Sequence, residues 1–205
     1  MKKILLFLFV AFAFTFNVNA QDRSSDDQLS DEAVQEVQER TIQLITDFQG
    51  YLTQIGDKSN PDDVKEFYIK RALRLFMGEG DDYIIDGRYH KAVIMQVSSL
   101  RNGIETKRDK PMKQYLQNLK RLRYTSVRIE KAETVRISNI YKVGDHYEGQ
   151  AIFFQYFEGK TGERTVYRDK TKKSVKIYVV REDDDWGTHW SVKFGDIKVE
   201  ETTAG

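Results

Sequence analysis

The sequence predicts an α+β fold, with helices concentrated before residue 123 and strands after it. Apolar side chains recur at helical spacing in three segments of the first part, whereas from Tyr124 to Val199 their period is two. The 205-residue chain contains no cysteine, so a hydrophobic core has to supply the stability that disulfides would otherwise add. Residues 21–205 are rich enough in Phe, Tyr, Val and Ile to form one such core.

The first 20 residues have the pattern of a secretory signal peptide. Lysines at positions 2 and 3 precede an apolar run from Ile4 to Phe16, and the small residues Val18 and Ala20 mark a cleavage site. The run is shorter than the roughly 20 apolar residues of a membrane span. We therefore expect secretion across the inner membrane to the periplasm. Because the first mature residue is Gln21 and not cysteine, no lipid anchor is expected.

Removal of the signal peptide leaves 31 basic and 32 acidic side chains, so the formal charge changes from +1 to −1. A chain of this balance has no electrostatic reason to bind a polyanion. We expect no nucleic-acid partner and no membrane span.

Residues 21–28 are polar and charged and are expected to form a disordered tether before a single domain at 29–201, with a disordered tail at 202–205. Ser30 is the expected N-cap of the first helix, which Gly56 ends. Its buried face is defined by residues at helical spacing, namely Val34, Val37, Thr41, Leu44, Phe48, Leu52 and Ile55.

Asn60 and Pro61 predict the start of a second helix, because asparagine caps well and proline fits the first helical position. Gly78 and Gly80 are expected to end it. Its predicted buried residues are Val64, Phe67, Tyr68, Leu75 and Phe76. Pro111 opens a third helix, in which Met112, Tyr115, Leu116, Leu119 and Leu122 recur at helical spacing.

Two short strands are predicted at 83–86 and 92–98, the second followed by an Asn102-Gly103 turn. Four long strands joined by short turns follow, and such an order predicts an antiparallel meander. Their expected ranges are 125–141, 147–157, 165–181 and 189–199.

This order of elements resembles the cystatin-like α+β roll of the nuclear transport factor 2-like superfamily. The closing segment 190–194 (WSVKF) resembles the last strand of that superfamily. The resemblance covers most of the mature chain and implies a strongly bent antiparallel sheet that wraps around the helices as a cone. It also implies that a cone interior can host proton transfer or hydration, and that the outer sheet face can form a dimer.

The strand segment 151–157 (AIFFQYF) is apolar on both faces, since Ile152, Phe154 and Tyr156 point opposite to Ala151 and its alternating neighbours. One face is expected to pack on the helices. The other is either covered by further elements of the same chain or forms a homodimer interface, and the sequence favours neither.

Tyr167, Asp169, Thr171 and Lys173 form a polar ladder at period two on one strand face, which becomes apolar from Val175 onward. The ladder either lines the mouth of the cone or projects beyond the sheet into solvent. Solvation is the ordinary state of charged side chains, and the sequence favours it.

No catalytic residue, cofactor or metal site is predicted. His90, His146 and His189 all lie next to turns or charged stretches and are expected to be peripheral. The acidic segment 182–185 lacks the spacing of a calcium loop and is expected to be a solvated hairpin turn.

The sequence therefore favours a secreted, non-enzymatic binding or assembly module, forming a homodimer through the sheet. Its partner would be a protein, a glycan or a small apolar ligand. The alternative is a small-molecule-binding or isomerase/hydratase-like enzyme that uses the cone interior. The aromatic side chains expected around such a cavity are Tyr68, Tyr115, Tyr156, Tyr167 and Trp190.

Overall fold

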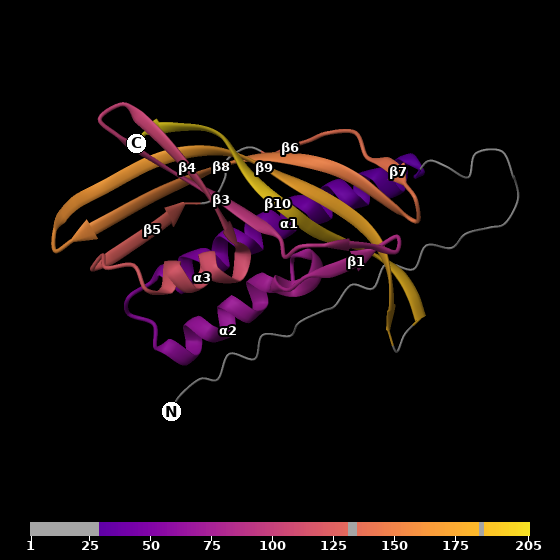
Figure 1. Cartoon of the computed structure of the whole chain (residues 1–205), viewed down its shortest axis with the longest axis horizontal. Helices are drawn as coiled ribbons and strands as arrows, with labels where there is room; N and C mark the ends of the chain where they lie inside the picture. The colour runs from indigo at the N-terminus through magenta and orange to yellow at the C-terminus, as the bar shows by residue number, and fades with distance from the viewer. Residues whose placement is uncertain (1–28, 131–134, 185–186) are drawn as a thin grey trace, which may run out of the picture.

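The computed structural model describes residues 29–130, 135–184 and 187–205, and its fold is α+β. Three α-helices lie against one face of a large curved sheet (Figure 1). The expected signal peptide and tether, residues 1–28, lie outside the described residues. Within the described part of the chain, no helix is both long and apolar enough to cross a membrane.

Helix α1 spans Asp31–Gly56, as predicted, and it lies along the inner face of the sheet (Figure 1). Ser30 is its N-cap, and the Ser30 hydroxyl accepts a hydrogen bond of 3.2 Å from the backbone N–H of Ala33. Its buried stripe carries the predicted residues Leu44, Phe48, Leu52 and Ile55, which anchor the core.

Helix α2 spans Asp62–Leu73 and ends earlier than the glycines predicted. A short 3-10 turn, η1 (Met77–Gly80), follows it, and Phe76 leaves the helix to form a bridge with Phe194 of the last strand. Phe67 was expected in the core but is 51% exposed. The helix turns Ile69, Ala72 and Leu73 inward instead, and Phe67 lies on the other side beneath the guanidinium of Arg71.

The sequence missed two strands between α2 and α3 (Met112–Lys120). Strand β2 (Arg88–His90) pairs with β1 (Tyr83–Ile85), and β4 (Ile104–Pro111) pairs with β3 (Ile94–Arg101). The predicted Asn102-Gly103 turn joins β3 to β4, and both turn residues have positive φ. Strand β4 carries a charged or polar side chain at almost every position, which is typical of an exposed edge strand and hides its period.

The main sheet has eight strands, in the order β4-β3-β10-β9-β8-β5, with β6 and β7 also paired to β8. Strands β8 (His146–Thr161), β9 (Arg164–Asp184) and β10 (Gly187–Ala204) form the predicted antiparallel meander. The predicted strand 125–141 is divided into β5 (Ser126–Glu130), β6 (Arg136–Ile137) and β7 (Tyr141–Val143).

Two sequence expectations about the sheet are wrong. The sheet is mixed rather than antiparallel, because β10 meets β3 in parallel through Ile197 and Met95. Residues 202–204, expected in a disordered tail, extend β10, and Thr203 pairs with Lys170 of β9. The long β9 offers a backbone ladder to this segment, which is why it continues the strand although Ala204 is its one apolar residue.

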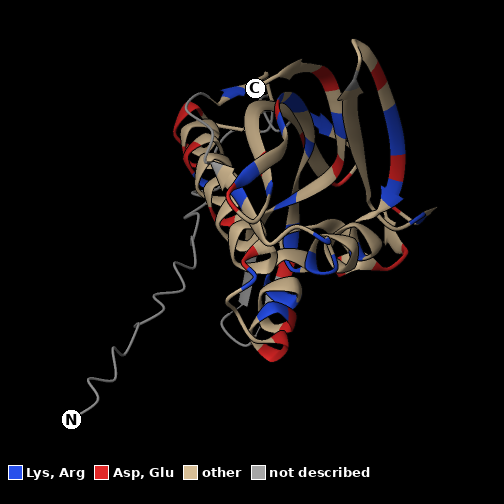
Figure 2. Ribbon diagram, turned by 90° about the vertical axis from the view of Figure 1, so that its left-hand side faces the viewer, with Lys and Arg blue, Asp and Glu red and all other residues tan. Residues whose placement is uncertain are grey.

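The sheet curls over the helices, as the view along the molecule shows (Figure 2). The pairing of β9 with β10 shifts register between Phe194 and Ile197, and a Cβ at Gly195 would lie 2.6 Å from the ring of Tyr178. Inside the curl, Phe76 packs edge-on against both Phe48 and Phe194, with ring centroids 5.1 and 5.7 Å away. Basic and acidic segments occur on helices and strands alike (Figure 2).

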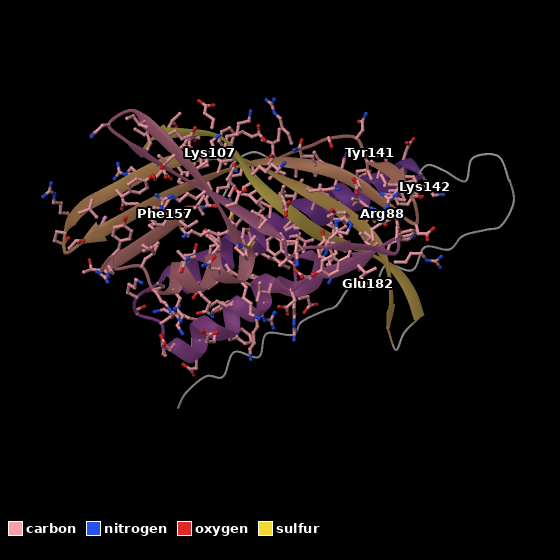
Figure 3. The ribbon with its side chains drawn as sticks, in the orientation of Figure 1. Arg88, Lys107, Tyr141, Lys142, Phe157 and Glu182 are labelled. Atoms are coloured by element: carbon pink, nitrogen blue, oxygen red, sulfur yellow. The ribbon has the colours of Figure 1, made fainter. Side chains whose placement is uncertain are left out.

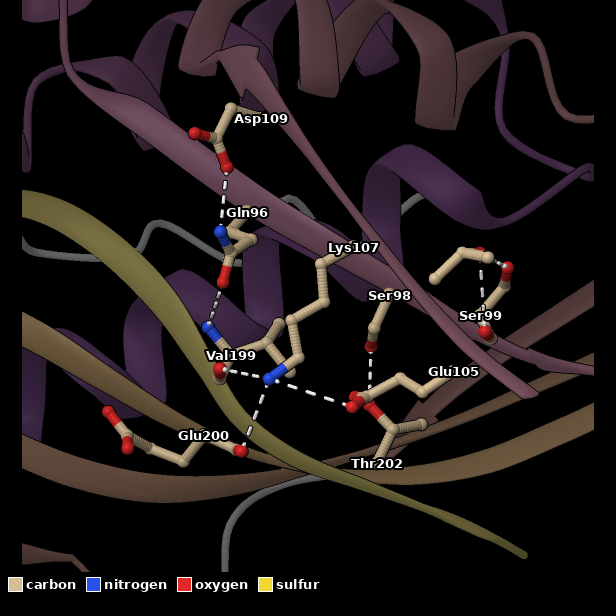
Figure 4. Close-up of polar contacts among 10 residues, drawn as sticks. Gln96, Ser98, Ser99, Glu105, Lys107, Asp109, Val199, Glu200 and Thr202 are labelled. Carbon is tan, nitrogen blue, oxygen red and sulfur yellow. Dashed lines mark hydrogen bonds and ion pairs between the residues drawn. The ribbon is translucent and has the colours of Figure 1, made fainter. Parts of the chain in front are cut away.

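Beyond the backbone pair of Ile197 with Met95, side chains join β3 and β4 to β10 (Figure 4). The Gln96 side chain accepts from the Val199 N–H at 3.1 Å and donates to Asp109 at 2.8 Å. The ammonium of Lys107 donates to the carbonyl oxygens of Val199 and Glu200, at 2.9 and 3.3 Å. We call this set of contacts the side-chain seam.

The substitution Lys107→Met removes the donor to two strand carbonyls and should lower the free energy of unfolding by about 1 kcal/mol. Urea unfolding followed by circular dichroism measures the change. Arg108→Met is the matched control, because Arg108 is the neighbouring exposed cation on β4 and should change stability by less than about 0.5 kcal/mol. Equal effects of the two variants would show that the seam contributes nothing beyond surface charge.

Candidate functional site

A cavity of about 220 Å³ lies between the inner face of the sheet and α3. It lies toward the end of the sheet that carries Phe157, away from the end of the molecule where Arg88 and Glu182 lie (Figure 3). Strands β3, β4, β8 and β9 and helix α3 all contribute walls. The residues on which the site depends are Tyr115, Gln155, Tyr167, Asp169, Thr171 and Lys173.

The polar ladder of β9 forms the floor of this cavity. Phe153, Gln155 and Phe157 of β8 lie opposite Lys173, Thr171 and Asp169 of β9 in the strand register, and these side chains share the inner face. Asp169 and Lys173 are each only 5% exposed. The expectation of a solvated ladder is therefore wrong, because the ladder lines a cavity on the inner face of the sheet.

The hairpin of β3 and β4 explains this burial. It extends over the start of β9, and the backbone N–H of Leu100 donates to the Tyr167 hydroxyl at 3.3 Å. Strand β4 was absent from the predicted fold, so nothing in that fold covered the ladder.

The carboxylate of Asp169 is held by its neighbours. The hydroxyl of Tyr167 donates to it at 2.5 Å, and the side chain of Thr171 also donates. Burial raises the pKa of Asp169, and these donors and Lys173 only partly oppose the rise. Burial and the bond to Asp169 likewise raise the pKa of Tyr167, so its hydroxyl keeps its proton.

The ammonium of Lys173 has no comparable partner. Its contact is with the thioether sulfur of Met95 at 3.8 Å, which is a weak acceptor. No carboxylate of the described residues lies within 4.0 Å of it. Burial lowers the pKa of Lys173 to about 8, and the nearby charge of Asp169 opposes the shift.

Gln155 is a second buried residue whose hydrogen-bonding capacity is not fully used. Burial raises the pKa of the Tyr115 hydroxyl to about 12. A hydrogen bond with the side chain of Gln155 partly opposes this rise. The amide therefore donates and the Tyr115 oxygen accepts. Gln155 is 5% exposed, and its Oε1 has no hydrogen-bond partner among the described residues.

The structure brings together two of the five predicted aromatic residues. Tyr115 and Tyr167 line the cavity. Tyr68 packs instead on Tyr51 of α1, with ring centroids 5.9 Å apart. Tyr156 lies on the outer sheet face, where the ammonium of Lys170 is 5.0 Å from its ring.

Trp190, the fifth, lines a separate open groove of about 920 Å³ at the other end of the molecule, where it packs on Tyr147. His146 also lines that groove. It was expected to be peripheral but is 5% exposed, with its ring nitrogens 2.9 Å from Asp86 and 3.1 Å from Glu148. The tip of the β1–β2 hairpin buries it by folding against the turn before β8.

The outer face of β8 is covered in part by lysine. The ammonium of Lys170 lies 4.7 Å from the ring of Phe154, and Ile152, Phe154 and Tyr156 are all partly buried. A long cationic side chain thus shields some of the apolar surface that the sequence predicts on both faces.

Comparison with known proteins finds no family model, no curated protein and no solved structure that matches this chain.

The substitution Lys173→Met should make the protein more stable at pH 7, by up to about 3 kcal/mol, because it removes a buried ammonium and keeps an unbranched side chain. The folded pKa of about 8 is below the ordinary lysine pKa of 10.5, so between these values the unfolded chain binds more protons and wild-type stability rises with pH. The advantage of the variant should therefore shrink as pH rises from 8 to 10.5.

Urea unfolding at pH 7, 8, 9 and 10 measures this difference. Lys172→Met, which removes a lysine from the opposite face of the same strand, controls for the loss of a positive charge. A constant difference between K173M and wild type across this range would show that Lys173 is not buried as a charged group.

Proposed function

We propose that this chain is a small-molecule-binding protein and that its ligand occupies the cavity between α3 and the inner face of the sheet. The observation that carries the proposal is a pair of buried, underused polar groups facing one cavity, Lys173 Nζ and Gln155 Oε1. Buried polar groups are normally satisfied, and each one that is not costs roughly 1–3 kcal/mol. A bound molecule that meets both groups would recover that cost.

The shape of the site also suits a small ligand. Its volume of about 220 Å³ is far above the roughly 10–15 Å³ that a single water molecule needs. Leu119, Leu122, Phe157 and Val97 supply apolar walls, while the polar groups cluster on β8 and β9. Apolar walls with a few convergent polar groups are typical of ligand sites.

The proposal includes the fold family and the location. A curled sheet around three helices, with a cavity at the sheet end, supports membership of the nuclear transport factor 2-like superfamily with its cystatin-like roll. A signal-peptide pattern in the sequence supports secretion to the periplasm. Dimerisation through the outer face of β8 remains a prediction of the same proposal.

A second candidate function is favoured by one contact, the hydrogen bond of 2.5 Å from Tyr167 to Asp169. A buried carboxylate with a raised pKa can move a proton to or from a bound carbonyl compound. Exchange of the α-protons of a bound ketone in D₂O would reveal such an isomerase-like activity, and Asp169→Asn should abolish it. A ketone that binds without exchange would restrict the site to binding.

Saturation-transfer NMR of the mature chain with a panel of small amphipathic alcohols, phenols and acids tests the binding proposal. Leu122→Trp, which places a larger side chain at the cavity wall, should weaken binding at least tenfold. Ile84→Trp is the control, because Ile84 is 70% exposed and lines the separate groove near Trp190. Binding lost in I84W but kept in L122W would move the ligand site to that groove and overturn the proposal.

A further inference from the structure

Among the described residues, the cavity as a whole carries more positive than negative charge. Its lining includes the two ammonium groups of Lys110 and Lys173 but one carboxylate, that of Asp169. Lys110 is half-buried at the rim, whereas Lys173 is deep. A bound anion would find a net attraction there, and a cation would meet repulsion.

The carboxylate of Asp169 does not form an ion pair with the ammonium of Lys173. Asp169 accepts hydrogen bonds from Tyr167 and Thr171, and in the described part of the chain no ion pair within 4.0 Å joins it to the Lys173 ammonium. Lys173 keeps its thioether contact instead. A buried ammonium in this state gains most from an acceptor that carries a full negative charge.

Resting on the proposed function, we infer that the ligand is a small carboxylic acid with an apolar body, and that its carboxylate pairs with the ammonium of Lys173. A single carboxylate matches the single deep cation. A phosphate monoester would bring up to two charges against one deep cation, next to the carboxylate of Asp169.

The neighbouring phenol can complete the recognition of the head group. Because the oxygen of Tyr115 accepts from the amide of Gln155, its own O–H proton is free to donate to a ligand carboxylate. The apolar body of the ligand then lies along Leu119, Leu122 and Phe157.

The side chain of Gln155 further limits which carboxylic acids fit the cavity well. Its free Oε1 is an acceptor and requires a donor. A carboxylate offers none, but a hydroxyl group near the carboxylate does. A 2-hydroxy acid should therefore bind more tightly than the plain acid of the same chain length.

Isothermal titration calorimetry with octanoate and 1-octanol at pH 7 tests the inference. Octanoate should bind wild type at least tenfold more tightly than 1-octanol. Lys173→Met should remove most of this preference, because it should lower octanoate affinity far more than 1-octanol affinity. Lys172→Met, on the outer face of the same strand, should leave both affinities unchanged.

Two further measurements protect the result from a folding artefact. Lys173→Arg retains the charge and should retain the preference for octanoate. Octanoate affinity of the wild type should fall as pH rises above about 8, where Lys173 loses its proton, while 1-octanol affinity should not.

2-Hydroxyoctanoate should bind at least threefold more tightly than octanoate, and Gln155→Leu should cancel that gain.

The outcomes separate the inference from the proposed function. Equal binding of octanoate and 1-octanol, both weakened by Leu122→Trp, would overturn the carboxylate inference and leave the binding cavity in place. Absence of binding by both probes and by the NMR panel would overturn the proposed function as well. An octanoate preference that persists in Lys173→Met would place the anion elsewhere and overturn the inference.

Discussion

Strand β9 contributes side chains to both the hydrophobic core and the cavity. The rest of the structure depends on the change from apolar to polar residues along its inner face. Val175, Ile177 and Val179 are buried against the helices, and two residues before Val175 the same face presents Lys173 and then a polar run. Side chains at period two cannot leave that face unless the register slips. The polar run therefore has to stay on the inner side, and the hairpin of β3 and β4 covers it.

The side-chain seam helps to leave room for the cavity. A continuous parallel ladder would hold β3 within roughly 4.8 Å of β10 along its whole length. The ladder is limited to Ile197 and Met95, and beyond that pair Gln96, Lys107 and the contact of Ser98 with Thr202 span the gap. Val97 and Ser98, on the β3 side of this gap, are also cavity walls.

The sequence was sufficient to predict the helices and strands in which apolar side chains recur regularly. The helix from Asp31 to Gly56, the start of the third helix at Met112 and the strands β8 to β10 follow from apolar spacing and from cap and turn residues. It was insufficient for β4, where charge at nearly every position removes the alternation that identifies a strand. It was also insufficient for the parallel meeting of β3 and β10, a long-range pairing that local patterns do not encode.

Because β4 was not predicted, the polar ladder of β9 was wrongly expected to be solvated. Tyr115 and Tyr167 could be selected as aromatic residues on predicted elements, and the polar ladder was visible as a pattern. Whether the ladder was solvated depended on a strand pair that covers it, and one half of that pair was missing from the predicted fold. Gln155 could not be identified because a single glutamine in an aromatic strand has no pattern of its own.

The energetics of Lys173 argue for a role in binding rather than in folding. Burying an ammonium costs several kcal/mol before compensation, and the contact with Met95 returns little of it. A methionine or leucine at this position would extend the aliphatic face of β9 by one residue and would stabilise the fold. The core formed by Phe48, Phe76 and Phe194 is extensive enough to tolerate the cost. A group that lowers stability, faces a cavity and has an unused hydrogen-bonding capacity supports the proposed binding site.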